Sequence, residues 1–333
     1  MRKFWPTKDN RIAITGAGGL IGSTLANTLH RQGYKVLAID NFEKGRREAL
    51  DEGIEIRQID LRVLYTKSPL FRGYSTVIHL ASKVGGIGYY TDNPYEVLRQ
   101  NILIDSNTLD CPIENKVRNY FYASSAHIYS KLKGLIKEED GKNTSPILSY
   151  GWAKLLGEKQ LQCAIEEGKI KGAIARYIGI YGEGQVFDLD VGSVIPVLCH
   201  RAVRYPELPF TLWGTGKETR TYCYIEDAID ATMRMIGRLY VDDIVGPLNI
   251  GGEPTPISIE NIAKEIIQIS GKDITINYDT SKETVLWEQT CDCSAAYKLL
   301  HGWKATTSLN EGLQRIYKDV ERRLQHTPQE YSR

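Results

Sequence analysis

A glycine-rich turn near the N-terminus constrains the fold of this chain more than any other feature. The turn spans residues 15–22, reads TGAGGLIG and follows the short apolar segment 11–14. Beyond it, apolar residues recur at helical spacing and share one helix face: Leu20, Ile21, Leu25, Ala26 and Leu29. A strand, a tight glycine turn and a helix form a Rossmann unit, whose backbone approaches the pyrophosphate of a dinucleotide at the helix N-terminus. We therefore expect a dinucleotide cofactor to be held by the turn residues Gly16, Gly18, Gly19, Leu20, Ile21 and Gly22.

The end of the next apolar segment indicates which dinucleotide is bound. Residues 35–39 are apolar after Lys35 and lead into Asp40 and Asn41. A carboxylate at this place accepts hydrogen bonds from the adenosine ribose and repels a 2′-phosphate. Asp40 and Asn41 therefore predict NAD as the cofactor. The cations Lys44, Arg46 and Arg47 follow closely, so the alternative of NADP stays open at this point.

Composition excludes several classes of protein. The 333 residues carry a net charge of +1, which gives no sign of a nucleic-acid partner or an anionic membrane surface. No apolar run approaches the roughly 20 residues of a membrane span, and the N-terminal residues lack the apolar core of a secretion signal. Among six cysteines only Cys291 and Cys293 are close together, which is a poor pattern for a metal site. We expect a cytoplasmic protein with reduced thiols and no metal.

Strand-like and helical segments alternate through the first half of the chain. The strand-like runs are 12–15, 35–40, 54–59, 76–81, 119–124 and 173–180, with helical stretches such as 95–109 and 150–166 between them. Repeated units of this kind indicate a parallel sheet with helices on both faces. The fold class expected is α/β, a doubly wound Rossmann sheet over residues 1–180 that a strand near 247–250 rejoins. Residues 181–333, richer in Gly and Pro, are expected to form a smaller α/β lobe that binds the substrate.

A tyrosine and a lysine supply the first candidate chemistry. Tyr150 and Lys154 lie four residues apart and hence on one helix face. A phenol is a poor base at neutral pH, but a neighbouring ammonium and a positive nicotinamide ring favour the phenolate. Ser125 follows a strand, at the sheet edge where open parallel sheets bind ligands. We expect Tyr150 to remove the proton of a substrate alcohol that Ser125 also contacts, with Lys154 as the activating cation.

These motifs, taken in order, resemble the extended short-chain dehydrogenase/reductase family. The resemblance rests on the glycine turn, Asp40, Ser125 and the Tyr150–Lys154 pair, and it continues through the segments 213–220 and 299–313 to cover nearly the whole chain. It implies five further contacts to NAD, from Asp60, Leu61, Leu80, Ala81 and Lys83. It also implies a homodimer assembled through the helix that carries Tyr150.

Two segments are most similar to the GDP-mannose 3,5-epimerases and GDP-fucose synthases within this family. They are the Gly-Gly loop 83–87 and the segment 123–129. The similarity implies substrate contacts from Gly85, Gly86, Ser125, Ser193, Trp213 and Arg220, with Arg220 pairing with a diphosphate. In the 3,5-epimerases, a cysteine two positions after the serine moves protons at C3 and C5 of a 4-keto sugar. His127 stands at that position here, and Ser193 at that of the second acid/base.

His127 determines the reaction that we expect. An imidazole is a competent base at neutral pH. The predicted function is therefore NAD-dependent modification of a GDP-mannose type nucleotide sugar through a 4-ketone, by epimerisation at C3 or C5. A 4-epimerase and a C4 dehydrogenase stay open, with His127 then only contacting the hexose. A 4,6-dehydratase is disfavoured because Ala126 replaces its acid, and a regulator without turnover is disfavoured by the intact set Ser125, Tyr150 and Lys154.

Three other segments receive simpler interpretations. Tyr89 and Tyr90, just after the Gly-Gly loop, are expected near the substrate. The charged run 133–142 is expected to be a solvated loop over the site. The charged stretch 315–323 is expected to be an exposed helix.

Overall fold

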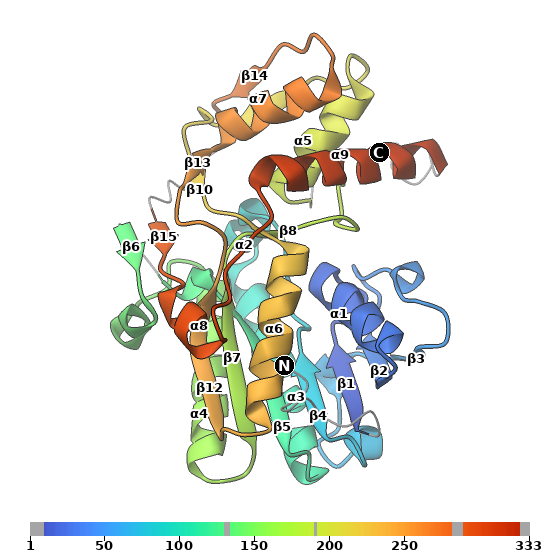
Figure 1. Cartoon of the computed structure of the whole chain (residues 1–333), viewed down its shortest axis with the longest axis vertical. Helices are drawn as coiled ribbons and strands as arrows, with labels where there is room; N and C mark the ends of the chain where they lie inside the picture. Colours follow the sequence, from blue (N-terminus) through green and yellow to red (C-terminus); the bar gives the residue numbers. More distant parts are fainter. Residues whose placement is uncertain (1–9, 130–133, 190–191, 282–288, 327–333) are drawn as a thin grey trace.

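The centre of the molecule is a seven-stranded parallel sheet with strand order β12-β7-β5-β4-β1-β2-β3 (Figure 1). The computed structural model describes residues 10–129, 134–189, 192–281 and 289–326. The strands are β1 (Arg11–Thr15), β2 (Lys35–Asp40), β3 (Glu55–Gln58), β4 (Thr76–His79), β5 (Asn119–Ser125), β7 (Lys171–Tyr177) and β12 (Ile244–Ile250). The expected doubly wound Rossmann fold is confirmed.

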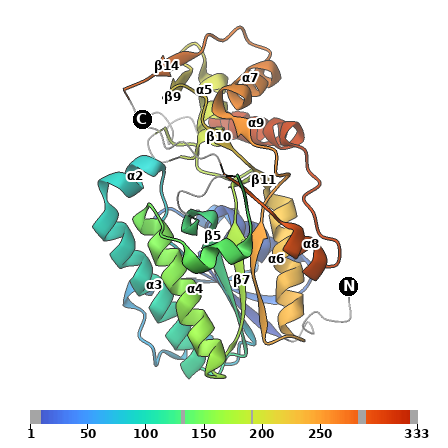
Figure 2. The same ribbon diagram turned by 90° about the vertical axis from the view of Figure 1, so that its left-hand side faces the viewer.

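Helices cover both faces of this sheet, as Figure 2 shows. On one face lie α3 (Pro94–Glu114) and α4 (Ser149–Glu166), and on the other α1 (Leu20–Arg31) and α6 (Ile225–Leu239). Successive strand residues point to opposite faces, so each strand serves two cores. Ile12 and Ile14 of β1 belong to the core under α1 and α6, whereas Ala13 belongs to the core under α3 and α4.

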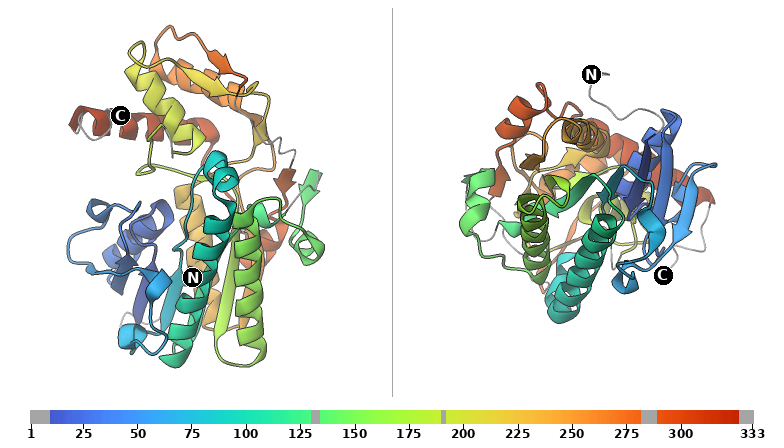
Figure 3. Two further views of the ribbon diagram at one scale, coloured as in Figure 1. Left: turned by 180° about the vertical axis from the view of Figure 1, so that it is seen from behind. Right: turned by 90° about the horizontal axis from the view of Figure 1, so that it is seen from below.

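A smaller lobe lies over the C-terminal edge of the sheet, shown from behind in Figure 3. Its helices α5 (Val194–Arg204), α7 (Ile259–Ser270) and α9 (Leu309–His326) pack against one another. Two strand pairs complete it, β9 (Thr211–Trp213) with β14 (Asn277–Asp279) and β10 (Thr219–Arg220) with β13 (Ile257–Ser258). Because α6 and β12 return to the sheet, the second half of the chain contributes to both parts.

Short elements connect the two parts. They are α2 (Ile87–Asp92), β6 (Gly134–Ile136), β8 (Ile180–Tyr181), β11 (Cys223–Tyr224), β15 (Gln289–Cys291) and α8 (Ser294–Leu299). β8 pairs with β11, and β6 pairs with β15. Within the part of the chain that the structure describes, no helix is long and apolar enough to cross a membrane.

Two surface interpretations from the sequence are wrong in part. Residue 133 lies outside the described residues, but 134–136 form a strand and Glu138–Asn143 a 3-10 helix. The Glu138 carboxylate accepts the Asn249 amide at 2.8 Å, and its burial raises the pKa of Glu138. Likewise α9 is exposed on one face only, because Ile316 and Val320 on its other face lie in the core of the small lobe.

A buried ion pair ties three elements around the sheet together. The Arg176 guanidinium of β7 donates two hydrogen bonds to the Glu158 carboxylate of α4, at 2.9 and 2.7 Å. It also donates to the Tyr129 hydroxyl at 2.8 Å, and the Ser124 hydroxyl of β5 donates to Glu158. The side chains of Arg176 and Glu158 are only 4% and 2% exposed. Each charge therefore depends on its partner in place of water.

Removal of the arginine tests this dependence. Arg176→Leu leaves the Glu158 carboxylate buried and unpaired, so we expect the free energy of unfolding to fall by about 3–5 kcal/mol in urea denaturation at pH 7. The control is Lys169→Leu, which breaks the exposed pair of Lys169 with Glu167 and should change stability little. Similar effects of the two variants would contradict the expectation.

Candidate active site

A deep cleft at the C-terminal edge of the sheet brings the predicted residues together. Its volume of about 1030 Å³ exceeds the roughly 300–1,000 Å³ of pockets for one drug-sized ligand. It begins at the glycine turn, passes the ends of β4 and β5, and continues to the N-terminus of α5 in the small lobe. The cleft is thus large enough for a dinucleotide and a second ligand.

The glycine turn fits a bound pyrophosphate. Gly16 has φ +69°, and a β-carbon there would lie 2.6 Å from the Ala81 amide nitrogen. A β-carbon on Gly22 would lie 2.1 Å from the Gly16 carbonyl oxygen, so the turn packs too tightly for larger residues. Gly19 directly precedes α1 and has no side chain to cap it, so the first amides of the helix stay available to an anion.

The Asp40 carboxylate is fixed beside this turn. It accepts hydrogen bonds from the backbone amides of Gly18 at 2.9 Å and Phe42 at 2.8 Å. Two of the three neighbouring cations that kept NADP open are engaged elsewhere, since Lys44 donates to the Val84 carbonyl and Arg46 pairs with Glu48 at 2.9 Å. The third, Arg47, lies 5.9 Å from the centroid of the Phe42 ring. Asp40 lines this end of the cleft, and its predicted role of binding the adenosine ribose of NAD stays a prediction.

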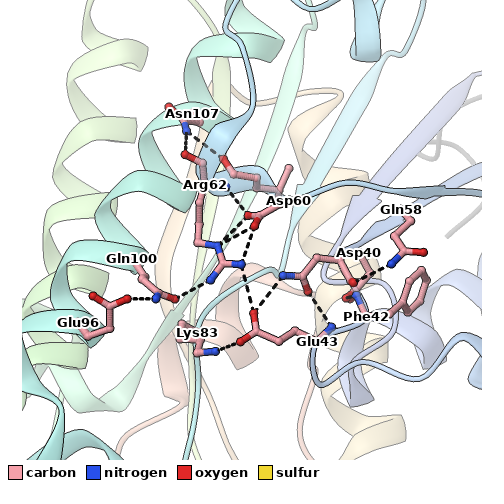
Figure 4. Close-up of polar contacts among 12 residues, drawn as sticks. Asp40, Phe42, Glu43, Gln58, Asp60, Arg62, Lys83, Glu96, Gln100 and Asn107 are labelled. Atoms are coloured by element: carbon pink, nitrogen blue, oxygen red, sulfur yellow. Dashed lines mark hydrogen bonds and ion pairs between the residues drawn. The ribbon is translucent and has the colours of Figure 1, made fainter.

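Figure 4 shows a network of polar side chains around Asp60 and Arg62. The Arg62 guanidinium binds both Asp60 oxygens, at 2.8 and 2.6 Å, and these hydrogen bonds hold the pKa of Asp60 below its usual range. Arg62 also donates to Gln100 at 3.0 Å and pairs with Glu43 at 3.3 Å. Glu43 in turn pairs with Lys83. Asp60, Leu61 and Lys83, predicted to contact NAD, line this end of the cleft with Arg62 and Glu43, which sequence reasoning missed.

The catalytic candidates converge in the middle of the cleft. Ser125 ends β5, Tyr150 lies in the first turn of α4 and Lys154 lies one turn later, and all three are buried. Burial raises the pKa of Tyr150 well above its ordinary value, while hydrogen bonds to Ser82 and Ser125 act in the opposite direction. The Lys154 ammonium lies 5.9 Å from the centroid of the Tyr150 ring.

His127 joins this group through Ser125. Its Nδ1 lies 2.9 Å from the Ser125 hydroxyl oxygen, and its ring meets the Tyr150 ring edge-on at 5.5 Å between centroids. Burial, together with the positive charge of Arg220, lowers the pKa of His127 to about 4. The imidazole is therefore neutral at neutral pH and can accept a proton or a hydrogen bond.

Tyr90 forms the wall of the cleft over Tyr150. Its ring stacks on that of Tyr150 with 4.9 Å between centroids and 6° between planes. Its hydroxyl accepts the Gly85 amide at 3.2 Å, and burial raises the pKa of Tyr90 to about 12. The Gly-Gly loop and α2 are thereby attached to the catalytic centre. Gly85, Gly86 and Tyr90 line the cleft as expected for substrate contacts, whereas Tyr89 is not among the described lining residues.

The small lobe closes the far end of the cleft. Ser193 directly precedes α5 and its hydroxyl receives a hydrogen bond from Gln185 at 3.2 Å, while Arg220 ends β10. Gln185 and Arg323 of α9 also line this end, and neither was predicted. The expected contact of Trp213 with the substrate stays a prediction. Trp213 ends β9 in the pair with β14, is 44% exposed and does not belong to the described cleft lining.

One missed residue carried a signal in the sequence. Asp105 lies on α3 at the spacing of the buried positions Val97, Asn101 and Thr108, so a carboxylate stands where an apolar side chain is expected. A charged residue on a buried helix face is uncommon unless it is paired. Asp105 is 2.9 Å from His79 and 3.8 Å from the Lys154 ammonium.

The Rossmann sheet and the set of Ser125, Tyr150 and Lys154 define an enzyme of the extended short-chain dehydrogenase/reductase class. The sequence profile of the NAD dependent epimerase/dehydratase family matches residues 12–251. The chain belongs to this family, and NAD is its cofactor, which confirms both predictions.

Similar proteins act on nucleotide sugars. GDP-mannose 3,5-epimerase 1 of Oryza sativa subsp. japonica is 29% identical over 321 residues, which cover 95% of this chain and 82% of that protein. UDP-N-acetyl-alpha-D-glucosaminuronate decarboxylase of Bacillus cytotoxicus is 30% identical over 267 residues, 78% of this chain and 80% of that protein. The structure of UDP-glucuronic acid 4-epimerase from Bacillus cereus, in complex with UDP-glucuronic acid and NAD, has a TM-score of 0.82 and 27% identity, covering 94% of this chain and 99% of that chain.

Asp40 provides a test of cofactor selection. We expect Asp40→Ala to reduce the preference for NAD over NADP on the order of tenfold, because the carboxylate that repels a 2′-phosphate is removed. The measurement is calorimetric titration of nucleotide-free protein with each dinucleotide. Glu52→Ala, which removes an exposed carboxylate nearby in the sequence, should keep the parent ratio. An unchanged ratio in Asp40→Ala would show that other groups select the cofactor.

Proposed function

We propose that this protein is a nucleotide-sugar epimerase that acts on a GDP-sugar of the manno type, at C3 or C5, through a 4-keto intermediate. One observation carries the proposal. The Ser125 hydroxyl, the Tyr150 phenol and the neutral imidazole of His127 meet at one point of the cleft, with His127 Nδ1 at 2.9 Å from Ser125. The arrangement offers an acid/base for an alcohol and a second, separate proton acceptor.

Tyr150, Ser125 and Lys154 serve the oxidation of C4. Tyr150 takes the proton of the C4 hydroxyl, and Ser125 donates a hydrogen bond to the same oxygen. Burial disfavours the phenolate of Tyr150, and the Lys154 ammonium, 5.9 Å from the centroid of the Tyr150 ring, is the positive charge that we propose to offset this effect. Bound NAD supplies the hydride acceptor and later donor for C4.

His127 then serves the epimerisation. A 4-ketone makes the protons at C3 and C5 acidic, and a neutral imidazole next to Ser125 is placed to remove one of them. Inversion also requires that a proton return to the opposite face of the same carbon, and we propose Ser193, at the second acid/base position, or a water molecule as its donor. Because Ser193 is a weak acid, a standard inversion at both carbons is disfavoured. Arg220 is placed to bind the diphosphate, and the GDP preference rests on the likeness to GDP-mannose 3,5-epimerases.

A 4-epimerase is the second candidate, and a specific observation favours it. The pKa of about 4 makes His127 a weak base, better suited to a hydrogen bond with the hexose. A 4-epimerase needs no base beyond Tyr150, but the 4-keto sugar must turn over in the cleft. Release of the 4-keto sugar before the return of hydride would instead make the enzyme a C4 dehydrogenase.

Solvent exchange separates these reactions. We expect the parent enzyme, incubated with GDP-mannose in D₂O, to incorporate deuterium at C3 or C5, read by NMR. His127→Ala should abolish incorporation, and His127→Cys should restore part of it. Tyr150→Phe should lower all turnover by about 10²–10⁴-fold, since it removes the base for C4. Product without deuterium in the parent would favour the 4-epimerase or the dehydrogenase, and UDP-, dTDP- and CDP-sugars run in parallel test the base preference.

We also propose a homodimer formed through α3 and α4. These helices lie side by side on one face of the molecule (Figure 2). The outer side of α4 carries Trp152 and Leu156, which are 40% and 45% exposed, and α3 carries the partly buried Leu98 and Ile102. A two-fold axis would pack this surface against its own copy.

Light scattering tests the dimer. At micromolar concentration we expect twice the mass of the chain, and the double variant Trp152→Glu/Leu156→Glu should give the monomer because two charges would enter the interface. Tyr297→Glu, a change at an exposed aromatic of α8, is the matched control and should stay dimeric. A monomeric parent would refute the proposal.

Two further assignments complete the proposed function. Residues 1–180 hold NAD, and residues 181–333 supply most of the nucleotide-sugar contacts. The six cysteines are all unpaired, which supports work in a reducing compartment such as the cytoplasm.

A further inference from the structure

A buried polar cluster lies behind the catalytic lysine. Its centre is Asp105 of α3, whose side chain is 3% exposed. The Lys154 ammonium lies 3.8 Å from Asp105 Oδ1, and the Tyr122 hydroxyl donates to Oδ2 at 2.6 Å. The His79 ring contacts Oδ1 through Nε2 at 2.9 Å. One carboxylate is thus shared by groups from α4, β5 and β4.

The same cluster reaches the cofactor turn. His79 Nδ1 lies 2.7 Å from the hydroxyl of Thr15, which ends β1 immediately before Gly16. Burial lowers the pKa of His79, so its ring is neutral. The hydrogen-bond pattern then assigns the ring proton to Nε2, facing Asp105, and leaves Nδ1 to accept from Thr15.

Lys154 needs a counter-charge at this place. Its side chain is 2% exposed, and burial lowers the pKa of Lys154, an effect that reaches several units for fully buried ammonium groups. Asp105 raises it by charge and hydrogen bonding. Glu158 acts in the same direction, but its two oxygens are bound by Arg176. Among the described residues, Asp105 is the carboxylate in ion-pair contact with Lys154.

We propose that Asp105 is a positioning residue of the active site, which holds Lys154 in place and in its charged form behind Tyr150. This inference rests on the proposed function for its effect on the reaction. Its effect on Lys154 itself is a property of the folded chain and does not depend on the substrate.

Asp105 has two opposing effects on Tyr150, and their balance makes the proposal testable. Its negative charge acts directly against the phenolate and raises the pKa of Tyr150. Through Lys154 it has the opposite effect, because the cation that it maintains stabilises the phenolate. We expect the effect through Lys154 to be the larger, because the ammonium lies 3.8 Å from Asp105, and the direction in which the rate profile moves decides between the two.

Stability of the ligand-free protein gives the first measurement. Where the folded pKa of Lys154 is depressed, the unfolded chain binds more protons, so stability rises with pH between the folded value and about 10.4. Asp105→Asn should lower the pKa of Lys154 in the folded protein still further. The variant should therefore unfold at a lower urea concentration than the parent at pH 7. The difference between their midpoint urea concentrations should become smaller toward pH 9.5. His79, Tyr120, Tyr122 and Tyr150, which face the cluster, keep their uncharged forms in this range because His79 is shifted down and the tyrosines up.

Two controls make the result decisive. Asp110→Asn changes an exposed carboxylate on the same helix and should give no pH-dependent difference. In a Lys154→Met background, Asp105→Asn should lose its destabilising effect, since no ammonium remains to be paired. The proposal would be overturned if Asp105→Asn lost the same stability at both pH values, or if it still lost stability in the Lys154→Met background. Both comparisons hold even if Asp105→Asn folds poorly.

The rate profile gives the second measurement. In Asp105→Asn the rising limb of kcat/KM against pH should move to higher pH by about a unit or more, because a neutral Lys154 no longer favours the phenolate. NAD affinity should stay within a few-fold of the parent. A limb that stays in place or moves to lower pH would overturn the proposal. If no nucleotide sugar is turned over, the proposed function fails, while the stability comparison still decides the role of Asp105.

Discussion

The contact of Gly16 with the backbone of Leu80 and Ala81 is the constraint on which the site depends. Gly16 follows β1 and Ala81 follows β4, and these neighbouring strands lie where the strand order reverses direction. Ligands of open parallel sheets bind at such a switch point. The two loops touch, and no β-carbon would fit between them. The N-terminus of α1 therefore lies at the cleft, and the ends of β4 and β5 line the same cleft.

One face of α4 then organises the chemistry. Tyr150, Lys154 and Glu158 follow one another at four-residue spacing and so share that face. Each meets a partner from a different element: Ser125 of β5, Asp105 of α3 and Arg176 of β7. The helix is thereby held against two strands of the sheet and against α3 by three polar contacts whose members are all buried. Buried charge pairs of this kind add geometric definition more than net stability.

The sequence predicts the parts of this molecule that depend on local pattern. Apolar runs predicted the sheet strands, and the motifs predicted the glycine turn, Asp40, Ser125, Tyr150 and Lys154, which all line one cleft. Features that depend on tertiary packing escaped prediction. Trp213 was placed by motif likeness, but its strand pairs with β14 and the residue is not among the described lining residues of the cleft. Arg323 was assigned to solvent from its charge, yet α9 packs on α5 and brings it to the cleft, where it lies 4.4 Å from the Phe187 ring centroid.

The low pKa of His127 bears differently on the free and the substrate-bound enzyme. Burial is the main cause, and the positive charge of Arg220 is the second. Under the proposed function Arg220 pairs with the diphosphate of the nucleotide sugar, whose negative charges offset its own. Substrate binding then offsets the second cause, so the pKa of His127 is expected to be higher in the substrate complex than in the empty cleft, while burial continues to lower it. The imidazole is then a weak base in the empty cleft and a stronger base when a nucleotide sugar is bound. The pKa of about 4 in the empty cleft therefore argues less strongly against epimerisation.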